Sequence, residues 1–217
     1  MGTKVANNGN GGDYTPPPTG IHRAVCVSYV DIGTQKSEWQ GEVKWQNKVM
    51  VTWELPDETY EKDGENIPFT VSKFYTKSLH EKSNLRHDLV SWRGREFTDD
   101  ELKGFDLDNI LGKSCQLNVV HKAGKTGGTR AVVSAVLPLS KGMAQATPST
   151  DTWRYDIGEQ GYNFPEQLSD KMKALIGSCR EMSAANCLPG SPYGGSEEPI
   201  IEPEDYGVQD DDDSIPF

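Results

Sequence analysis

The stretch Lys44-Trp45-Gln46-Asn47-Lys48-Val49-Met50-Val51-Thr52-Trp53-Glu54-Leu55 alternates in character along its length. One set of alternate positions is apolar and comprises Val49, Val51, Trp53 and Leu55. The other set is mainly polar and basic, with one apolar residue, and comprises Lys44, Gln46, Lys48, Met50 and Thr52. Because successive side chains of a strand point to opposite faces of a sheet, the pattern predicts a strand with one face in a core and the other in water.

Four other stretches predict strands, because they are rich in β-branched and apolar residues and are bounded by turn residues. They are residues 22–32, where Gly33 supports a turn, and residues 69–76, 115–122 and 129–137. The last two are joined by Ala123-Gly124-Lys125-Thr126-Gly127-Gly128, which is typical of a flexible, basic hairpin loop.

Helices are expected between the third and fourth strands. Ser78-x-x-Glu81 has capping-box spacing, so it predicts the start of a helix that carries Leu79, Leu85, Leu89 and Trp92. Thr98-x-x-Glu101 repeats the signal before a short helix. The order strand, strand, strand, helix, strand, strand is that of the OB-fold, a five-stranded Greek-key barrel. We therefore expect a mainly β protein with an OB-fold domain over residues 20–142.

The flanking regions differ from this body in composition. Residues 1–19 contain Pro16-Pro17-Pro18 and few hydrophobics, which favours a flexible segment. Residues 143–187 predict a polar linker and then a helix docked on the body, with Pro165 in its first turn. Its apolar residues are Leu168, Met172, Leu175, Ile176 and Cys179. Residues 188–217 are rich in Pro, Gly and acid, so we expect a disordered tail.

The net charge of −11 ordinarily argues against nucleic-acid binding. However, nine of the 33 acidic residues lie in residues 188–217, which contain no Lys or Arg. A second acidic group lies between Glu54 and Glu65, with Lys62 as its one base. Charge is thus segregated along the chain, which indicates separate surfaces for separate partners.

Several classes of protein are disfavoured. The chain has no run of the roughly 20 apolar residues that a membrane span needs, and its Asn/Gly/Pro-rich start does not resemble a secretory signal. The cysteines at 26, 115, 179 and 187 are far apart and form no C-x-x-C pair, which argues against a zinc ribbon or a disulfide framework. We expect a cytoplasmic protein with no cofactor, metal or membrane partner.

The chain ends in Asp210-Asp211-Asp212-Asp213-Ser214-Ile215-Pro216-Phe217. This end resembles the tail tip of bacterial single-stranded DNA-binding proteins, although Ser214 is a small departure from their pattern. The resemblance implies that the tip binds replication and repair proteins, with the Phe217 side chain in an apolar pocket and its carboxylate against a basic residue. The expected partner-binding residues are Asp210, Asp211, Asp212, Asp213, Ile215, Pro216 and Phe217.

The body carries a second, independent resemblance. The strings Asp31-Ile32-Gly33-Thr34-Gln35, Gly41-Glu42, Val49-Met50-Val51-Thr52-Trp53-Glu54-Leu55-Pro56, Ser78-Leu79-His80-Glu81-Lys82-Ser83-Asn84-Leu85-Arg86, Ser91-Trp92-Arg93-Gly94-Arg95 and Gly104-Phe105-Asp106 lie within residues 20–140. They resemble a family of tailed-phage proteins taken to be single-stranded DNA-binding replication proteins. Both resemblances imply the same function.

Single strands are held by basic grooves with aromatic faces on which bases stack. On an OB barrel, the groove crosses the second and third strands between the first-to-second and fourth-to-fifth loops. The expected DNA contacts are Trp39, Lys44, Trp45, Lys48, Lys73, Tyr75, Lys122, Lys125 and Arg130. Phe74 is then expected in the core.

Some positions have two interpretations. Alternation places Trp45 on the core face, whereas a bulge at the start of the strand would turn it outward. Trp92-Arg93-Gly94-Arg95 is either a helix end with Gly94 as C-cap, which is favoured, or an edge that contacts DNA. The acidic group from Glu54 to Glu65 is interpreted as a solvated loop rather than a metal site.

The expected function is non-enzymatic. We expect a sequence-tolerant protein that coats single-stranded DNA during phage replication or recombination and recruits a helicase, polymerase or nuclease through its C-terminal tip. A homo-oligomer is compatible with the sequence, and the choice between DNA and RNA stays open. Two alternatives are an adaptor or inhibitor that mimics the tail and binds no DNA, and a metal-dependent nuclease that uses the acidic group.

Overall fold

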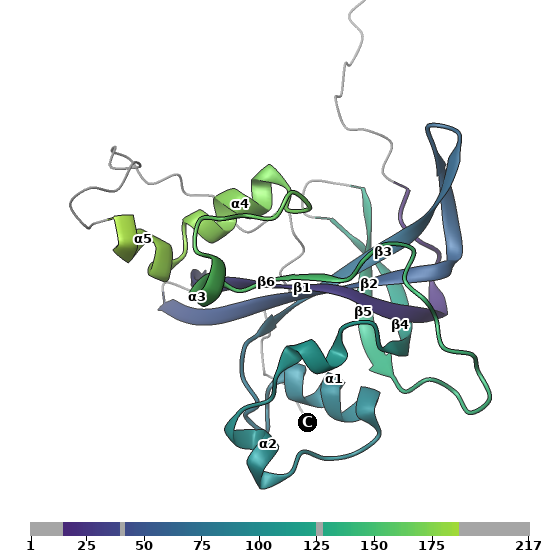
Figure 1. Ribbon diagram of the computed structural model, residues 1–217, viewed down its shortest axis with the longest axis horizontal. Coiled ribbons are helices and arrows are strands. Elements are labelled where there is room, and N and C mark those ends of the chain that lie inside the picture. Colours follow the sequence, from purple (N-terminus) through teal and green to yellow (C-terminus); the bar gives the residue numbers. More distant parts are fainter. Residues whose placement is uncertain (1–14, 40–41, 125–127, 187–217) are drawn as a thin grey trace, which may run out of the picture.

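The computed structural model describes residues 15–39, 42–124 and 128–186. The protein is mainly β, as expected, and is built on one curled antiparallel sheet that forms a half-barrel (Figure 1). Its strands are β1 (Gly20–Trp39), β2 (Glu42–Lys62), β3 (Glu65–Thr76), β4 (Ser114–Ala123) and β5 (Thr129–Leu137), in the order β3-β2-β1-β4-β5. A short strand, β6 (Trp153–Tyr155), pairs in parallel with β1.

The helices form two groups on opposite sides of the sheet (Figure 1). Between β3 and β4 lie α1 (Asn84–Arg93), α2 (Asp99–Lys103) and the 3-10 helix η1 (Leu107–Ile110). After β6 come α3 (Ile157–Gln160), α4 (Asp170–Gly177) and α5 (Arg180–Asn186). No helix within the described residues is long and apolar enough to cross a membrane.

The concave face of the sheet packs against α1. Trp53, Leu55 and the other apolar residues of this face form one cluster with Leu85, Leu89 and Trp92 of the helix. The Trp92 indole also donates a hydrogen bond of 2.9 Å to the Ser114 carbonyl. Helix α1 therefore closes the interior of the half-barrel.

The convex face is also covered. Val30, Ile32 and Phe74 from the sheet form a second cluster with apolar residues of the C-terminal helices: Leu168, Met172, Leu175, Ile176, Cys179 and Met182. All five apolar positions predicted for the docked helix are buried in it. The helix itself begins at Asp170 with Ser169 as N-cap, so the placement of Pro165 in its first turn was wrong.

Three strands extend beyond their predicted bounds. β1 continues through Gly33, which has a φ of 68° and lies at a register shift, so Gly33 is in a bulge rather than a turn. β2 continues to Lys62, and β3 starts at Glu65. The loop predicted for the acidic group is therefore a hairpin. Its first residue, Glu54, is buried and accepts hydrogen bonds from the backbone and hydroxyl of Ser149.

The two predicted capping boxes have different outcomes. Thr98 and Glu101 form one at the start of α2, as predicted. Ser78 and Glu81 do not, because α1 begins at Asn84 after Ser83, and the Ser78 hydroxyl instead accepts from the backbone of His80. Neither motif contains a Pro or Gly that would mark a turn. The Ser/Thr-x-x-Glu spacing alone therefore could not distinguish the helix start at Thr98 from the turn at Ser78.

Candidate nucleic-acid interface

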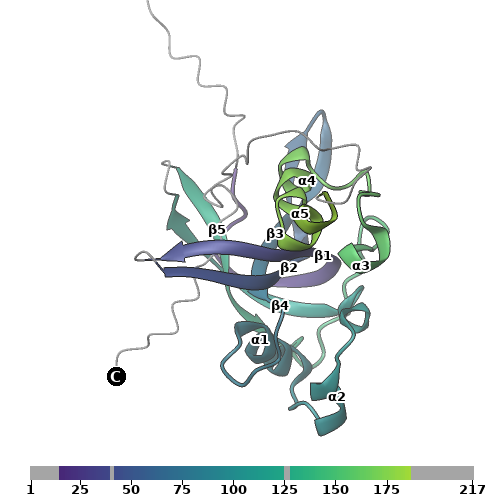
Figure 2. The ribbon, with the colours of Figure 1, turned by 90° about the vertical axis from the view of Figure 1, so that its left-hand side faces the viewer.

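The far ends of β1 and β2 form a two-stranded ribbon, which we call the arm (residues 33–39 and 42–48). The strands pair from Gly33 with Lys48 to Trp39 with Glu42. β3 joins β2 only from Lys48 onward, and β6 joins β1 only at residues 28–30. The arm therefore projects beyond the rest of the sheet (Figure 2).

Trp45 lies on the arm and is 50% exposed. This decides between its two interpretations in favour of the outward one. The reason is not a bulge in β2, which pairs continuously from Trp45 to Val49; Trp45 is exposed because the arm extends beyond the part of the sheet that β3 joins. Lys36 is the cross-strand partner of Trp45 and is exposed, and the Arg180 guanidinium carbon of α5 lies 5.8 Å from the centre of the Trp45 ring. Trp45 is therefore an exposed aromatic side chain with two cationic residues as neighbours.

Lys44 is exposed on the same arm. Because neighbouring residues of a strand alternate, Lys44 lies on the opposite side of the ribbon from Trp45. The structure thus brings Lys44 and Trp45 to one element but not to one face.

The base of the arm is held by α4 and α5. Glu181 accepts hydrogen bonds from the Thr34 backbone (2.8 Å) and hydroxyl (2.6 Å), and Gln35 donates to the Leu175 carbonyl at 3.1 Å. Desolvation raises the pKa of Glu181, but the hydrogen bonds from Thr34 outweigh it and leave that pKa below its ordinary value. Glu181 is thereby kept charged and directed at the arm.

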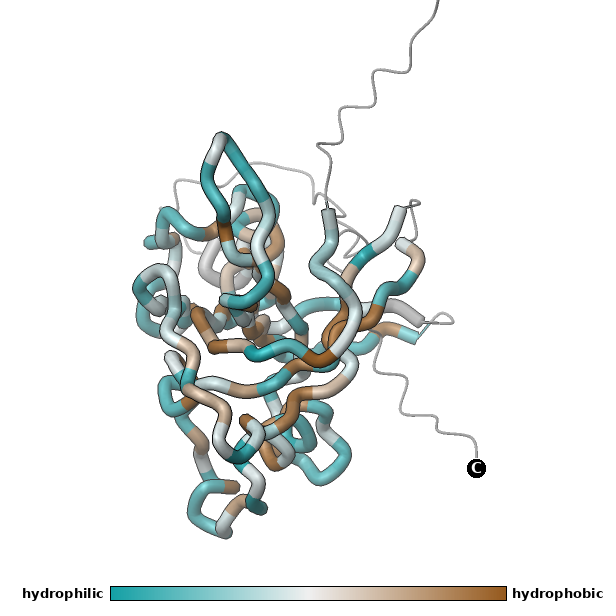
Figure 3. Tube along the Cα trace, turned by 90° about the vertical axis from the view of Figure 1, so that its right-hand side faces the viewer, coloured by the Kyte–Doolittle hydropathy of each residue, from teal (hydrophilic) through white to brown (hydrophobic). Residues whose placement is uncertain are grey.

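The hairpin between β4 and β5 points to the same side of the molecule as the arm (Figures 2 and 3). Lys122 and Arg130 are cross-strand partners in it. Lys122 is exposed, and the buried Arg130 Nε has no hydrogen-bond partner among the described residues. Figure 3 shows hydrophilic residues toward the ends of the hairpins and hydrophobic residues at the centre of the sheet.

Three predicted contacts are not on the surface. Lys48 is 8% exposed and Tyr75 is 2% exposed. Lys73 lies on the concave side, where its amine donates to Asp88 of α1 at 2.7 Å. Burial and the neighbouring Asp88 raise the pKa of Tyr75, whose hydroxyl donates to the same carboxylate.

The alternation of β3 was assigned in the wrong phase. Lys73 and Tyr75 pair with Val51 and Val49 of the core face, and Phe74 is buried on the opposite face beneath α4. Phe74 is a core residue, as expected, but of the second cluster. A lysine is rarely expected to point inward. Here Asp88 neutralises the charge of Lys73, which allows its inward position.

The remaining predicted contacts lie outside the described part of the chain. They are the side chain of Trp39, Lys125, Asp210, Asp211, Asp212, Asp213, Ile215, Pro216 and Phe217. Sequence reasoning missed Lys36 and Arg180. The cross-strand pairing of β1 with β2 identifies Lys36 as the neighbour of Trp45. Arg180 is identified only from the position of α5 in the folded protein.

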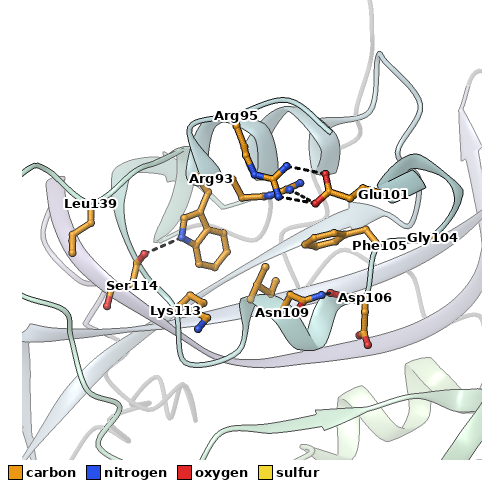
Figure 4. A pocket seen from close by; sticks show the side chains of 12 residues that line it. Arg93, Arg95, Glu101, Gly104, Phe105, Asp106, Asn109, Lys113, Ser114 and Leu139 are labelled. Carbon is orange, nitrogen blue, oxygen red and sulfur yellow. Dashed lines mark hydrogen bonds and ion pairs between the residues drawn. The ribbon is translucent and has the colours of Figure 1, made fainter. Parts of the chain in front are cut away.

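A separate pocket of about 600 Å³ lies where α1 meets α2 (Figure 4). Arg93 and Arg95 converge there on Glu101, and the Arg93 guanidinium carbon lies 4.3 Å from the Phe97 ring centre. The hydrogen bond from Arg95 is the main cause that lowers the pKa of Glu101 to about 2. Gly94 ends α1 in the left-handed conformation. The C-cap interpretation is confirmed, and both arginines are engaged by Glu101.

The acidic hairpin is partly neutralised from β1. Arg23 pairs with Asp57 at 2.6 Å, and its hydrogen bond lowers the pKa of that carboxyl. His22 lies 3.1 Å from Glu58. Among the described residues, no group of three or more His, Cys, Asp or Glu side chains is placed to hold a metal ion.

Comparison with known proteins adds no relative: no family model matches the chain, and no curated protein matches it.

Proposed function

We propose that this protein is an OB-fold protein that binds single-stranded DNA with little sequence preference. The fold assignment is supported by the five-stranded curled sheet, by β1 pairing with both β2 and β4, and by the closing position of α1. On this assignment, the arm and the β4–β5 hairpin are the two loops that flank an OB binding groove.

The observation that carries the proposal is the half-exposed Trp45 on a projecting ribbon with Lys36 opposite it. An exposed aromatic ring beside cations on a projecting ribbon is the kind of surface on which single-stranded nucleic-acid binders stack bases. A base stacked on such a ring contributes about 1–3 kcal/mol, and any base serves because each has a π-face. Lys36, Lys44 and Lys122 supply charge for the phosphates.

The biological role rests on the two sequence resemblances. The protein would coat exposed strand during phage DNA replication or recombination. Its C-terminal tip, with Ile215, Pro216 and Phe217 behind four aspartates, would recruit a helicase, polymerase or nuclease. An acidic leader steers encounters with basic partners, and a terminal aromatic residue provides a small anchor.

The test is a triple variant, Lys36→Ala with Lys44→Ala and Lys122→Ala, in a titration of labelled oligo-dT at several salt concentrations. Each phosphate contact in a single strand contributes about 0.7 to the salt slope, so we expect the slope to fall by about 2. Lys48→Ala and Lys73→Ala are unsuitable because both residues are largely buried, and their loss would test folding.

The matched control removes three exposed lysines outside the arm and hairpin: Lys103, Lys113 and Lys141. It has the same net charge as the test variant and should bind nearly as the wild type does. Equal losses in the two variants would show that binding depends on net charge alone. No binding of oligo-dT by the wild type would overturn the proposal and favour the tail-mimicking adaptor.

A further inference from the structure

We infer that the C-terminal helix α5 forms part of the nucleic-acid site, with Arg180 and Trp45 acting together on one nucleotide. This inference rests on the proposed function and adds to it an element that lies outside the OB-fold domain in the sequence. It assigns the base to the free face of Trp45 and the adjoining phosphate to Arg180.

The position of α5 is fixed by contacts on three sides. Cys179, directly before α5, is buried against the bulge at Gly33, where an added Cβ would lie 2.7 Å from the Cys179 sulfur. Glu181 bonds twice to Thr34 of the arm, and Met182 is 3% exposed in the convex cluster. Arg180 lies between these anchored residues, so its backbone is held beside the arm.

The Arg180 side chain is free for a ligand, apart from its contact with the ring. It is exposed, and no carboxylate pairs with it among the described residues. The neighbouring Glu181 is turned to Thr34 instead. Its guanidinium is therefore a cation at an aromatic face, and not half of a salt bridge.

The geometry defines how a nucleotide would lie. Two stacked layers need about 7 Å between their outer planes, since each contact is about 3.5 Å. The 5.8 Å between the Arg180 guanidinium carbon and the ring centre leaves no room for a base between them. A base must therefore use the other, exposed face of Trp45, which leaves the Arg180 donors for a phosphate oxygen.

This arrangement selects single strands. The bases of a duplex are already stacked on each other and cannot reach a ring on a ribbon without unpairing. The cation over the opposite face of the same ring can then bind the phosphate that adjoins the stacked base. The ligand class is a flexible single strand, with no requirement for a particular base.

The test measures oligo-dT affinity against salt for full-length Trp45→Ala, Arg180→Ala and Arg180→Lys. Trp45→Ala should weaken binding about tenfold and leave the salt slope unchanged, because it removes stacking but no charge. Arg180→Ala should weaken binding and lower the slope by about 0.7. Arg180→Lys should restore the slope but not all of the affinity, since lysine lacks the planar fork.

Lys103→Ala is the control, because Lys103 is exposed on α2, on the opposite side of the sheet from α5 (Figure 1). It should leave affinity and slope as in the wild type, and thermal melts of all variants should confirm folding. If the wild type binds and Arg180→Ala has wild-type affinity and slope, the inference is overturned while the proposed function stands. If the wild type itself does not bind, both are overturned.

Discussion

Asp88 is the residue that ties α1 to the sheet. Its carboxylate accepts hydrogen bonds from Lys73 at 2.7 Å and from the Tyr75 hydroxyl at 2.6 Å. The side chains of Lys73 and Asp88 are 10% and 17% exposed. Such a buried pair is weak evidence of net stabilisation, but removal of one partner leaves the other charge uncompensated.

Asp88→Ala should therefore lower the free energy of unfolding by about 3 kcal/mol, measured by urea denaturation. Asp100→Ala breaks the pair between Asp100 and Lys103, whose side chains are 91% and 75% exposed, and should change stability by less than about 1 kcal/mol. Similar losses in the two variants would contradict the role given to Asp88.

Gly33 is the second residue on which the architecture depends. It combines a φ of 68° with the close approach of Cys179 and Ile157, whose side-chain atoms would lie 2.7 and 2.8 Å from an added Cβ. Gly64 has a φ of 85° and no atom within 4 Å of an added Cβ. Gly33→Ala should therefore cost about 2 kcal/mol more than Gly64→Ala in denaturant unfolding. Equal costs would mean that Cys179 and Ile157 do not pack against the bulge as described.

At the scale of elements, the joint between α1 and α2 depends on one carboxylate. Glu101 accepts from Arg95, the largest cause of its pKa of about 2, and it also accepts from the Thr98 backbone. Because the folded pKa lies below the ordinary value of 4.5, the charged form is favoured in the folded protein. This stabilisation is fully present above about pH 4.5 and is lost as pH falls toward 2.

Glu101→Gln should accordingly flatten the fall of stability between pH 5 and about pH 2, in chemical denaturation carried out at several pH values. Above pH 5 its stability should be lower than that of the wild type by a constant amount. A pH dependence identical to that of the wild type would show that the contacts of Glu101 in the folded protein do not favour its charged form.

The elements also show how far sequence reasoning extends. β5 has its predicted bounds, and β4 differs by one residue at each end, because regular alternation ends there at turn residues. The arm was missed because Gly33 was interpreted as a turn, whereas a paired strand continues through it as a bulge. Arg180 was missed because periodicity identifies the buried face of a helix but not the surface on which it docks.

At the scale of the whole molecule, helices cover both faces of the sheet, and the arm carries the exposed residues Trp45, Lys36 and Lys44 beyond them. The face of β2 that carries Lys48 and Met50 was expected to be exposed to solvent and to form the DNA-binding groove. It is the convex face of the sheet, and α4 and α5 bury part of it. The candidate site is therefore displaced toward the projecting hairpins, where Trp45 and Lys122 lie.

Segregated charge predicts competition between the tail and DNA. Residues 188–217 carry nine acids and no base, and in the sequence they closely follow α5, whose first residue is Arg180. Deletion of residues 208–217 should strengthen oligo-dT binding at low salt, and the gain should shrink as salt screens the acids. Equal or weaker binding by the truncated protein at low salt would refute this competition.

The most direct measurement of the central claim is fluorescence anisotropy of labelled oligo-dT with the wild type and Trp45→Ala, with unlabelled duplex of equal length as competitor. The account predicts salt-sensitive binding by the wild type that duplex does not displace, and binding about tenfold weaker for Trp45→Ala. Ready displacement by duplex, or equal affinity of the two proteins, would contradict single-strand recognition at the arm.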